Sequence, residues 1–336
     1  MMNTIQKWQK SILLWTCKIM LIFSAVVNAA DNPRGEAFVD PAKRTDMPQS
    51  WIEKSIHYED WAKNADLAVT LDQQLYPALL PVIKDYAAQH QLDIAVQEGT
   101  CGISAKGLQD KSADIAGFCC PAAKIDRLPG VKFHTVGIAA IALFVHPDNP
   151  VKNITFAQAQ QIFQGDVFRW SDLDKKAEGI IQVLGRLHCK QRPGHWRLLL
   201  DNEDLFSPRL LEVSTIADMI SEAARDPNAI GYETLWMVNS LQDRGQVKIL
   251  SIDGILPTDN QKLAKGDYPL YRTYNITTWE TESIRNPKAQ ALAQYLMDYI
   301  DKLDIKKYGL VPVSKLRKAG WQFVDDEMIG EPKPKQ

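Results

Sequence analysis

The sequence predicts an α/β fold, because short apolar runs typical of β-strands alternate with segments whose apolar residues recur at helical spacing. A chain of this length, less a short leader, leaves about 300 residues, which suggests two domains. The expected strands cover residues 65–71, 92–97, 114–117, 131–145, 180–185, 229–232 and 247–252. The expected helices cover residues 75–90, 104–110, 155–163, part of 206–225, and 286–303.

The helix at 155–163 has the clearest limits. Thr155 can cap the free amides of its first turn, and Gly165 can close its last turn. The segment 131–145 is a long apolar stretch that reads as a buried strand and a candidate crossing between domains.

Composition and charge place the chain among ordinary globular proteins, with 24% charged and 45% hydrophobic residues. The formal net charge of −2 shows no excess of basic residues of the kind that binds nucleic acid. No nucleophile elbow, P-loop or metalloprotease helix is present in the sequence, so nothing in it favours an enzyme.

The amino terminus predicts export. Lys7 and Lys10 precede an apolar run over residues 11–27, and the small-residue sequence Val27-Asn28-Ala29 follows. This is the pattern of a signal peptide over residues 1–29, and it implies a periplasmic protein. Lys18 interrupts the run, which favours a cleaved peptide over a membrane anchor. Residues 30–63 are polar and read as an N-terminal arm.

Cysteines mark the candidate site. Cys17 leaves with the signal peptide, and Cys101, Cys119, Cys120 and Cys189 remain in segments that follow predicted strands. In an open α/β sheet, the loops beyond the carboxyl ends of the strands form the ligand crevice. We therefore expect these cysteines to gather at a site.

Three interpretations of the cysteines stay open. An even number in an exported protein favours disulfides among Cys101, Cys119, Cys120 and Cys189, although a bond between the adjacent Cys119 and Cys120 would be strained. Alternatively, soft ligands could hold Cu or Zn at Cys101, Cys119, Cys120, His188 and Cys189. One disulfide with two free thiols would instead suit redox sensing.

Several separated segments resemble the phosphate-binding protein family of periplasmic solute receptors. The strongest is Asn153 to Gly165 followed by Trp170-Ser171-Asp172-Leu173, which is similar to the family's N-L-T, I-F-x-G and W-S-D-L run. The order and spacing hold from about residue 65 to 315. The other matching segments are residues 114–121, 142–151, 227–232, 266–272 and 308–312.

This resemblance implies a two-lobed periplasmic-binding-protein (Venus flytrap) fold with mixed sheets and crossing hinge strands. Lobe I would combine residues 64–140 with 262–320, lobe II would be 141–261, and 321–336 would be a C-terminal tail. The implied function is that of a solute-binding protein that clamps a small, anionic ligand between its lobes and serves an ABC permease. A metal-binding or redox-sensing protein on the same scaffold is the alternative, as is a disulfide-locked interaction module in an envelope complex.

The ligand loops depart from the family's small, hydroxyl-rich pattern. Asp72 and Glu98 stand near the expected anion, where they would cost Coulomb energy, and large side chains block close approach of backbone amides. Phosphate is therefore not the default ligand. Arg186, Arg192 and Arg197 can still hold a carboxylate or another anion by bidentate hydrogen bonds. The expected ligand-binding residues are Gln74, Thr100, Cys101, Ser104, Cys119, Cys120, Arg186, His188, His195 and Arg197.

Cys189 decides whether the clamp can move. It would lie on lobe II, so a disulfide from Cys189 to a cysteine of lobe I would cross the cleft. A clamp locked in this way could not open to release a solute, which would argue against transport.

Overall fold

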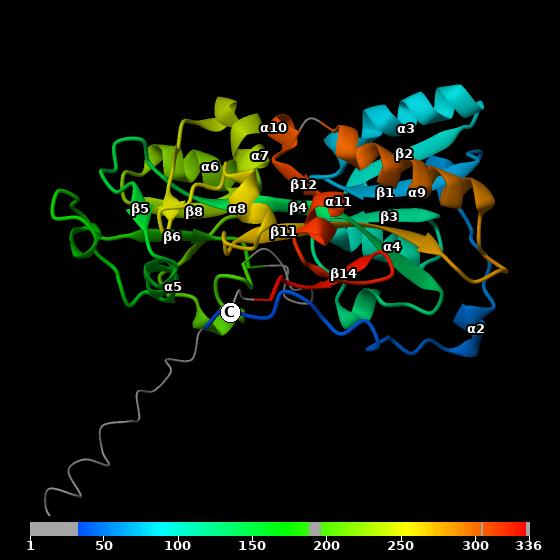
Figure 1. Cartoon of the computed structure of the whole chain (residues 1–336), viewed down its shortest axis with the longest axis horizontal. Helices are drawn as coiled ribbons and strands as arrows, with labels where there is room; N and C mark the ends of the chain where they lie inside the picture. The colour runs from blue at the N-terminus through cyan, green and yellow to red at the C-terminus, as the bar shows by residue number, and fades with distance from the viewer. Residues whose placement is uncertain (1–32, 188–195, 304, 334–336) are drawn as a thin grey trace, which may run out of the picture. The chain divides into compact units, whose positions relative to one another are not determined.

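A ten-stranded mixed sheet organises the chain, and Figure 1 shows helices packed around it. Its strands lie in the order β2-β1-β3-β11-β4-β8-β6-β7, and β12 and β9 also pair with β4. The bounds are β1 Leu67–Asp72, β2 Ile94–Gly99, β3 Ile115–Phe118, β4 Val131–Val145, β6 Gln182–Gly185, β7 Leu211–Glu212, β8 Ala229–Thr234, β9 Lys248–Ile249, β11 Tyr271–Trp279 and β12 Leu310–Pro312. This mixed α/β architecture confirms the predicted fold class.

The structure is a computed structural model that describes residues 33–187, 196–303 and 305–333. Residues Arg34–Gln336 form one compact unit, which contains the ten-stranded sheet. The predicted signal peptide, and the candidate residues His188, Cys189 and His195, lie outside the described residues. Within the described ranges, no helix is long and apolar enough to cross a bilayer.

The first lobe is built on the parallel strands β1, β2 and β3. Helix α4 (Cys101–Gln109) packs on β1 and β3, while α3 (Tyr76–His90) packs on β2 and on α9 (Pro287–Tyr299). Apolar side chains from these elements share one hydrophobic core, which includes Leu71, Leu79 and Leu292. The long amphipathic segments predicted at 75–90 and 286–303 are thus the helices that cover this lobe.

The second lobe is built on β8 and its parallel partner β6. Helix α6 (Ile216–Arg225) packs on both strands, and a separate core includes Phe163, Trp170 and Met219. The remaining elements are α2 Gln49–Ile52, α5 Phe156–Gln164, α7 Leu235–Ser240, α8 Asn260–Ala264, α10 Ile305–Tyr308, α11 Val313–Lys318, β5 Asn153–Ile154, β10 Ser251–Ile252, β13 Gln322–Val324 and β14 Glu327–Gly330. Short 3-10 turns lie at Asp60–Ala62, Lys124–Asp126, Trp170–Asp172, Glu203–Leu205, Gln242–Arg244 and Ile300–Lys302.

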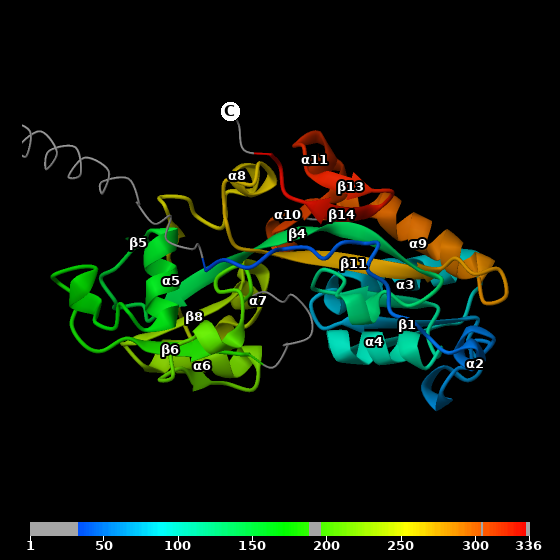
Figure 2. The ribbon, with the colours of Figure 1, turned by 90° about the horizontal axis from the view of Figure 1, so that it is seen from below.

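The strand β4 belongs to both lobes. Its residues 131–140 pair with β11, and its residues 141–145 pair with β8. Figure 2 shows it as one strand that passes from the group of β1 and α4 to the group of β8 and α5. This is the crossing strand that the apolar run at 131–145 predicts. The lobe limits that the family resemblance implies stay a prediction.

Two local details bear on the sequence-based expectations. The cap at Thr155 is confirmed, because its Oγ1 accepts a hydrogen bond from the Gln158 amide at 3.0 Å, and Gly165 closes the helix at φ 90°. The helix expected from residue 104 begins earlier, at Cys101, because Thr100 caps it and its Oγ1 accepts from the Ile103 amide at 3.4 Å.

The C-terminal segment differs from the expected tail. Residues 322–330 form the hairpin of β13 and β14, and Met328 is buried in the core of the second lobe. The hairpin docks through hydrogen bonds at Thr135, whose backbone amide donates to the Asp326 carbonyl at 2.9 Å and whose side-chain Oγ1 accepts from the Met328 amide at 2.9 Å.

Candidate functional site

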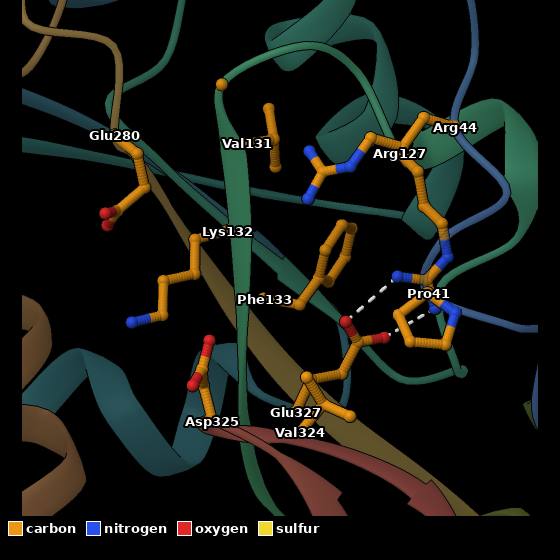
Figure 3. A pocket seen from close by; sticks show the side chains of 11 residues that line it. Pro41, Arg44, Arg127, Val131, Lys132, Phe133, Glu280, Val324, Asp325 and Glu327 are labelled. Atoms are coloured by element: carbon orange, nitrogen blue, oxygen red, sulfur yellow. Dashed lines mark hydrogen bonds and ion pairs between the residues drawn. The ribbon is translucent and has the colours of Figure 1, made fainter.

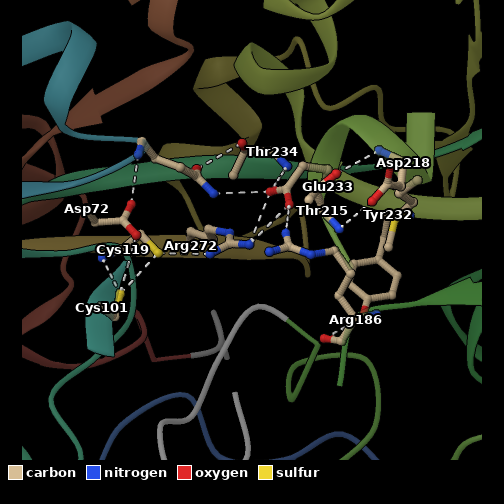
Figure 4. Close-up of polar contacts among 12 residues, drawn as sticks. Asp72, Cys101, Cys119, Arg186, Thr215, Asp218, Tyr232, Glu233, Thr234 and Arg272 are labelled. Carbon is tan, nitrogen blue, oxygen red and sulfur yellow. Dashed lines mark hydrogen bonds and ion pairs between the residues drawn. The ribbon is translucent and has the colours of Figure 1, made fainter. Parts of the chain in front are cut away.

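A buried polar cluster lies where strands of both lobes end (Figure 4). Strand β1 ends at Asp72, β3 is followed by Cys119, β6 is followed by Arg186, and β8 ends just after Glu233. Carboxyl ends of parallel strands share one edge of a sheet, which is why these residues meet. We call this set the central cluster; it comprises Asp72, Gln74, Cys101, Cys119, Cys120, Arg186, Glu233, Thr234, Arg272 and Tyr274.

Two arginines share one carboxylate at its centre. Arg186 Nη1 lies 3.3 Å from Glu233 Oε2, and Arg272 Nη2 lies 3.1 Å and 3.3 Å from the two Glu233 oxygens. Glu233 is 1% exposed, so its charge requires such partners. Burial lowers the pKa of Arg272, but Glu233 and the neighbouring thiols outweigh burial and hold that pKa well above its ordinary value. Arg272 is therefore charged.

Both arginines keep an Nε–H donor that has no partner among the described residues. Among the described residues, no acceptor lies within hydrogen-bond reach of Nε of Arg186 or of Arg272. Arg186 is 7% exposed and Arg272 is 4% exposed, so water reaches these side chains poorly. A buried donor left unsatisfied costs about 1–3 kcal/mol. Such a donor on each arginine indicates a place for an acceptor that the described residues do not supply.

Gln74 joins the two lobes. Its Nε2 donates to Glu233 at 3.2 Å, and its Oε1 accepts from Thr234 Oγ1 at 3.0 Å and from the Tyr274 hydroxyl at 2.6 Å. Gln74 follows β1 of the first lobe, whereas Glu233 and Thr234 belong to β8 of the second lobe. The amide therefore holds the lobes together at the cluster.

Three thiols lie beside the arginines. Cys101 Sγ is 3.3 Å from Cys119 Sγ, Cys119 Sγ is 4.0 Å from Cys120 Sγ, and all three sulfurs lie within 4.8 Å of one another. Arg272 Nη1 donates to Cys119 Sγ at 3.0 Å, and the Cys101 thiol donates to Asp72 Oδ2 at 3.7 Å. These separations exceed the S–S bond of about 2.05 Å, so no disulfide joins Cys101, Cys119 and Cys120 to one another.

Burial and mutual contact raise the pKa values of Asp72, Cys101 and Cys119. Hydrogen bonds to Cys119 and Cys120, together with burial, raise the pKa of Cys101 well above its ordinary value. The hydrogen bond from Cys101 lowers the pKa of Cys119, but the Cys120 contact and burial outweigh it and raise that pKa to about 12. Burial likewise raises the pKa of Asp72 well above the usual carboxyl range.

The structure brings together half of the predicted site residues, namely Gln74, Cys101, Cys119, Cys120 and Arg186. Thr100 caps α4, and Ser104 is fully buried in the same helix. Arg197 pairs with Asp201 at 3.1 Å, four residues further on. The roles given to all of these residues, and the disulfide pairings, stay predictions.

Sequence reasoning missed Glu233 and Arg272 as site residues. The available signal was a charged residue inside an otherwise buried strand. Glu233 ends the run Ala229-Ile230-Gly231-Tyr232, and Arg272 lies in a strand whose nine residues are all buried. A charged side chain in a buried strand requires a partner of opposite charge. The acidic Glu233 and the basic Arg272 could therefore have been predicted to pair with each other.

A cavity lies at the C-terminal hairpin (Figure 3). Its volume is about 260 Å³, and charged side chains of both signs line it, including Arg44, Lys132 and Glu280. Arg127 crosses it to make a bidentate pair with Glu327 at 2.9 Å and 2.6 Å. This pair fixes β14 against the first lobe.

A family of known proteins matches most of the chain. Residues 59–298 match the family model of the PBP superfamily domain. The chain belongs to this family. The predicted family resemblance and the two-lobed fold of PBP superfamily proteins are thereby confirmed.

Named relatives of this PBP superfamily chain are phosphate-binding proteins. The phosphate-binding protein PstS of Bacillus subtilis (strain 168) is 25% identical over 318 residues, covering 91% of this chain and 94% of the relative. The phosphate-binding protein PstS of Pseudomonas aeruginosa (strain PAO1) is 23% identical over 235 residues, covering 65% of this chain and 70% of the relative. The chain resembles phosphate ABC transporter substrate-binding proteins.

Solved structures share the PBP fold. An ABC-type phosphate transport receptor from Vibrio cholerae has a TM-score of 0.59 at 20% identity, covering 73% of this chain and 99% of its own. A phosphate ABC transporter substrate-binding protein with bound phosphate from Clostridium perfringens has a TM-score of 0.62 at 17% identity, covering 74% of this chain and 99% of its own. At these identities the likeness concerns the fold alone.

Proposed function

We propose that this protein is an exported solute receptor, not an enzyme, which holds a small anion between its two lobes and delivers it to an ABC permease. The observation that carries the proposal is the pair of buried guanidinium groups, each with an Nε–H that lacks a partner among the described residues. The phosphate-binding names of the relatives support an anionic ligand.

Charge at the cluster supports the same ligand class. Arg186 and Arg272 both contact Glu233, and that carboxylate is shared between them. Raised pKa values favour the neutral forms of Asp72, Cys101 and Cys119, so these groups do not offset the second arginine. An anion at these Nε–H groups would receive charge-assisted hydrogen bonds, which are stronger than neutral ones.

The lobes supply the mechanism of retention. Arg186 follows β6 of the second lobe, while Arg272 lies on β11 between the lobes, so a ligand that contacts both favours the closed form. A ligand shifts such an equilibrium only by its difference in affinity for the two forms. Gln74 makes closure favourable by contacting Glu233 and Thr234 across the same boundary.

Isothermal titration calorimetry on the exported form of the chain tests the proposal. Inorganic phosphate, sulfate and a small dicarboxylate are the probes, and we expect one of them to bind with one-to-one stoichiometry. Arg186→Gln and Arg272→Gln should each weaken that binding by about 10- to 100-fold, the worth of a hydrogen bond to a charged group. Arg186→Lys should lose less, because it keeps the charge.

Arg225→Gln is the matched control. Arg225 is exposed, and it pairs with Glu222 on the same helix, so its replacement should leave binding unchanged. Circular dichroism of every variant establishes that it is folded. Absence of binding by the parent protein to all three anions would overturn the proposal, as would unchanged affinity in both glutamine variants.

A further inference from the structure

We propose that the carboxylate of Glu233 is an internal ligand, which occupies an anion position between the two lobes and competes with solute anions for the same arginines. Glu233 would thereby set the affinity of the proposed receptor site, a role that rests on the proposed function. The donors that surround this carboxylate belong to the described residues, and both lobes contribute to them.

Glu233 receives the hydrogen bonds that a bound anion would receive. Its Oε1 accepts from Gln74 Nε2 at 3.2 Å, from the Thr234 backbone amide at 2.7 Å and from Arg272 Nη2 at 3.1 Å. Its Oε2 accepts from Arg186 Nη1 at 3.3 Å and from Arg272 Nη2 at 3.3 Å. Guanidinium groups, side-chain amides and backbone amides are the donors with which proteins hold free carboxylates and oxyanions.

These donors come from separate elements of both lobes. Gln74 follows β1 of the first lobe, Arg186 follows β6 of the second lobe, and Arg272 lies on β11. Figure 4 shows both guanidinium groups reaching Glu233 from the same side. The carboxylate therefore stands at the boundary of the two lobes, which is where the proposed receptor would hold its ligand.

An ordinary ion pair in the same chain is built differently. Arg127 and Glu327 form a bidentate pair, in which one guanidinium group contacts both carboxylate oxygens at 2.9 Å and 2.6 Å. Glu233 is instead shared by two guanidinium groups and by an amide of the opposite lobe. Two cationic groups around one carboxylate exceed what charge compensation requires. Such a surplus is expected of an anion-binding position.

Competition follows from the charge of Glu233. A solute anion at the Nε–H groups of Arg186 and Arg272 would stand close to the Glu233 carboxylate. Like charges at short separation in a poorly solvated site repel each other strongly. Glu233 therefore lowers the affinity of the site for anions, and through Gln74 it links the lobes without help from a solute. Removing its charge should strengthen the binding of an anion from solution.

Rescue of Glu233→Ala by acetate tests whether this is an anion position. The substitution removes Cγ, Cδ and both carboxylate oxygens, and acetate supplies the same heavy atoms. We expect the variant to melt about 5–10 °C below the parent, because the buried guanidinium groups lose their counter-charge. Acetate should raise that melting temperature in a saturable way, since a ligand that binds only the folded state stabilises it. Sodium chloride at equal ionic strength controls for screening.

Glu233→Gln is the second variant, because it keeps the shape of the side chain and removes its charge. Calorimetry with inorganic phosphate, sulfate and acetate should show at least one of them binding at least about 10-fold tighter than to the parent, since the like-charge repulsion is gone. Glu282→Ala is the matched control. Glu282 is exposed, so its replacement should change neither the melting temperature nor the anion affinity.

Two results would overturn the internal ligand. One is a Glu233→Ala protein whose melting temperature responds to acetate no more than to chloride. The other is a Glu233→Gln protein that binds none of the probes more tightly than the parent does, and this result decides alone if Glu233→Ala does not fold. The receptor function fails separately. A parent protein that binds none of the probes would contradict that function, while rescue of Glu233→Ala by acetate would still support the anion position.

Discussion

At the scale of single residues, Asp72 shows how burial sets the chemistry of this cluster. It is 2% exposed, and its Oδ1 accepts a hydrogen bond from the Gln74 amide at 2.8 Å. Burial raises its pKa well above the usual carboxyl range. The folded protein therefore binds a proton at Asp72 at pH values where the unfolded chain has released it.

This shift predicts a pH-dependent effect of Asp72→Asn. Between the unfolded pKa, about 3.9, and the higher folded pKa, the native state holds more protons, so stability falls as the pH rises. The asparagine side chain of the variant does not ionise, so the variant does not lose this stability as the pH rises. The variant should melt at a higher temperature than the parent at about pH 7.5, and the difference should shrink toward about pH 4.

Thermal melts of both proteins across this range provide the measurement. Asp85→Asn serves as the control, because Asp85 is exposed on α3, and it should melt like the parent at both ends of the range. A parent protein that is more stable than Asp72→Asn at neutral pH would contradict the raised pKa.

The residues of the site differ in how far the sequence could predict them. Cys101 and Cys119 each follow a strand-like run, so their meeting follows from the α/β pattern alone. Glu233 and Arg272 meet only because β8 and β11 flank β4, where Glu233 lies opposite Ala142 and Arg272 lies opposite Ala139. Strand order of this kind is a long-range property that local pattern does not reveal.

At the scale of elements, the hairpin of β13 and β14 depends on distant partners. Arg127 is buried and Glu327 is partly buried, with side chains 6% and 14% exposed, and they lie 200 residues apart in the sequence. Asp325 turns the hairpin at φ 50°, a left-handed conformation that asparagine and aspartate tolerate better than most residues. The segment reads as a tail in sequence because these anchors are not local.

Removing one partner of this pair should destabilise the protein strongly. Glu327→Ala leaves the Arg127 guanidinium buried without its counter-charge, which costs about 3–5 kcal/mol. The double variant Arg127→Met, Glu327→Leu removes both charges and should recover most of that loss.

Urea denaturation of the three proteins gives the free energies of unfolding. Glu282→Ala is the control, since Glu282 is exposed, and its effect should stay within about 0.5 kcal/mol. The ion pair would not be an anchor if Glu327→Ala proved as stable as this control.

Helix limits, by contrast, follow well from the sequence. Helix α5 begins after Thr155 and ends before Gly165, as the capping rules require. The Gln158 side chain completes a capping box, because it accepts a hydrogen bond from the Thr155 backbone amide at 2.8 Å. These interactions lie within one turn of the chain. Local chemistry therefore suffices to predict them.

At the scale of the whole molecule, Gln74 links the two lobes, and the proposed closure would depend on this link. Its three hydrogen bonds to Glu233, Thr234 and Tyr274 are each worth about 1 kcal/mol. Gln74→Ala should therefore raise the population of the open form, and small-angle X-ray scattering should report a larger radius of gyration.

The matched control is Gln294→Ala. Gln294 is exposed and donates to Asp298 at 2.9 Å on the same helix, so its loss should leave the scattering curve unchanged. Scattering curves that coincide for Gln74→Ala, the control and the parent would show that closure does not depend on this amide.

The shared strand β4 has a consequence for folding. Its side chains fill both hydrophobic cores, with Phe133 in one and Phe144 in the other. A shift of one residue in its pairing register would turn every side chain to the opposite face of the sheet. A wrong register in one lobe would therefore also misplace the side chains that β4 contributes to the core of the other lobe. The packing of both cores thus depends on one pairing register, that of β4. They should unfold in one cooperative transition, although each is large enough to resemble a domain of its own.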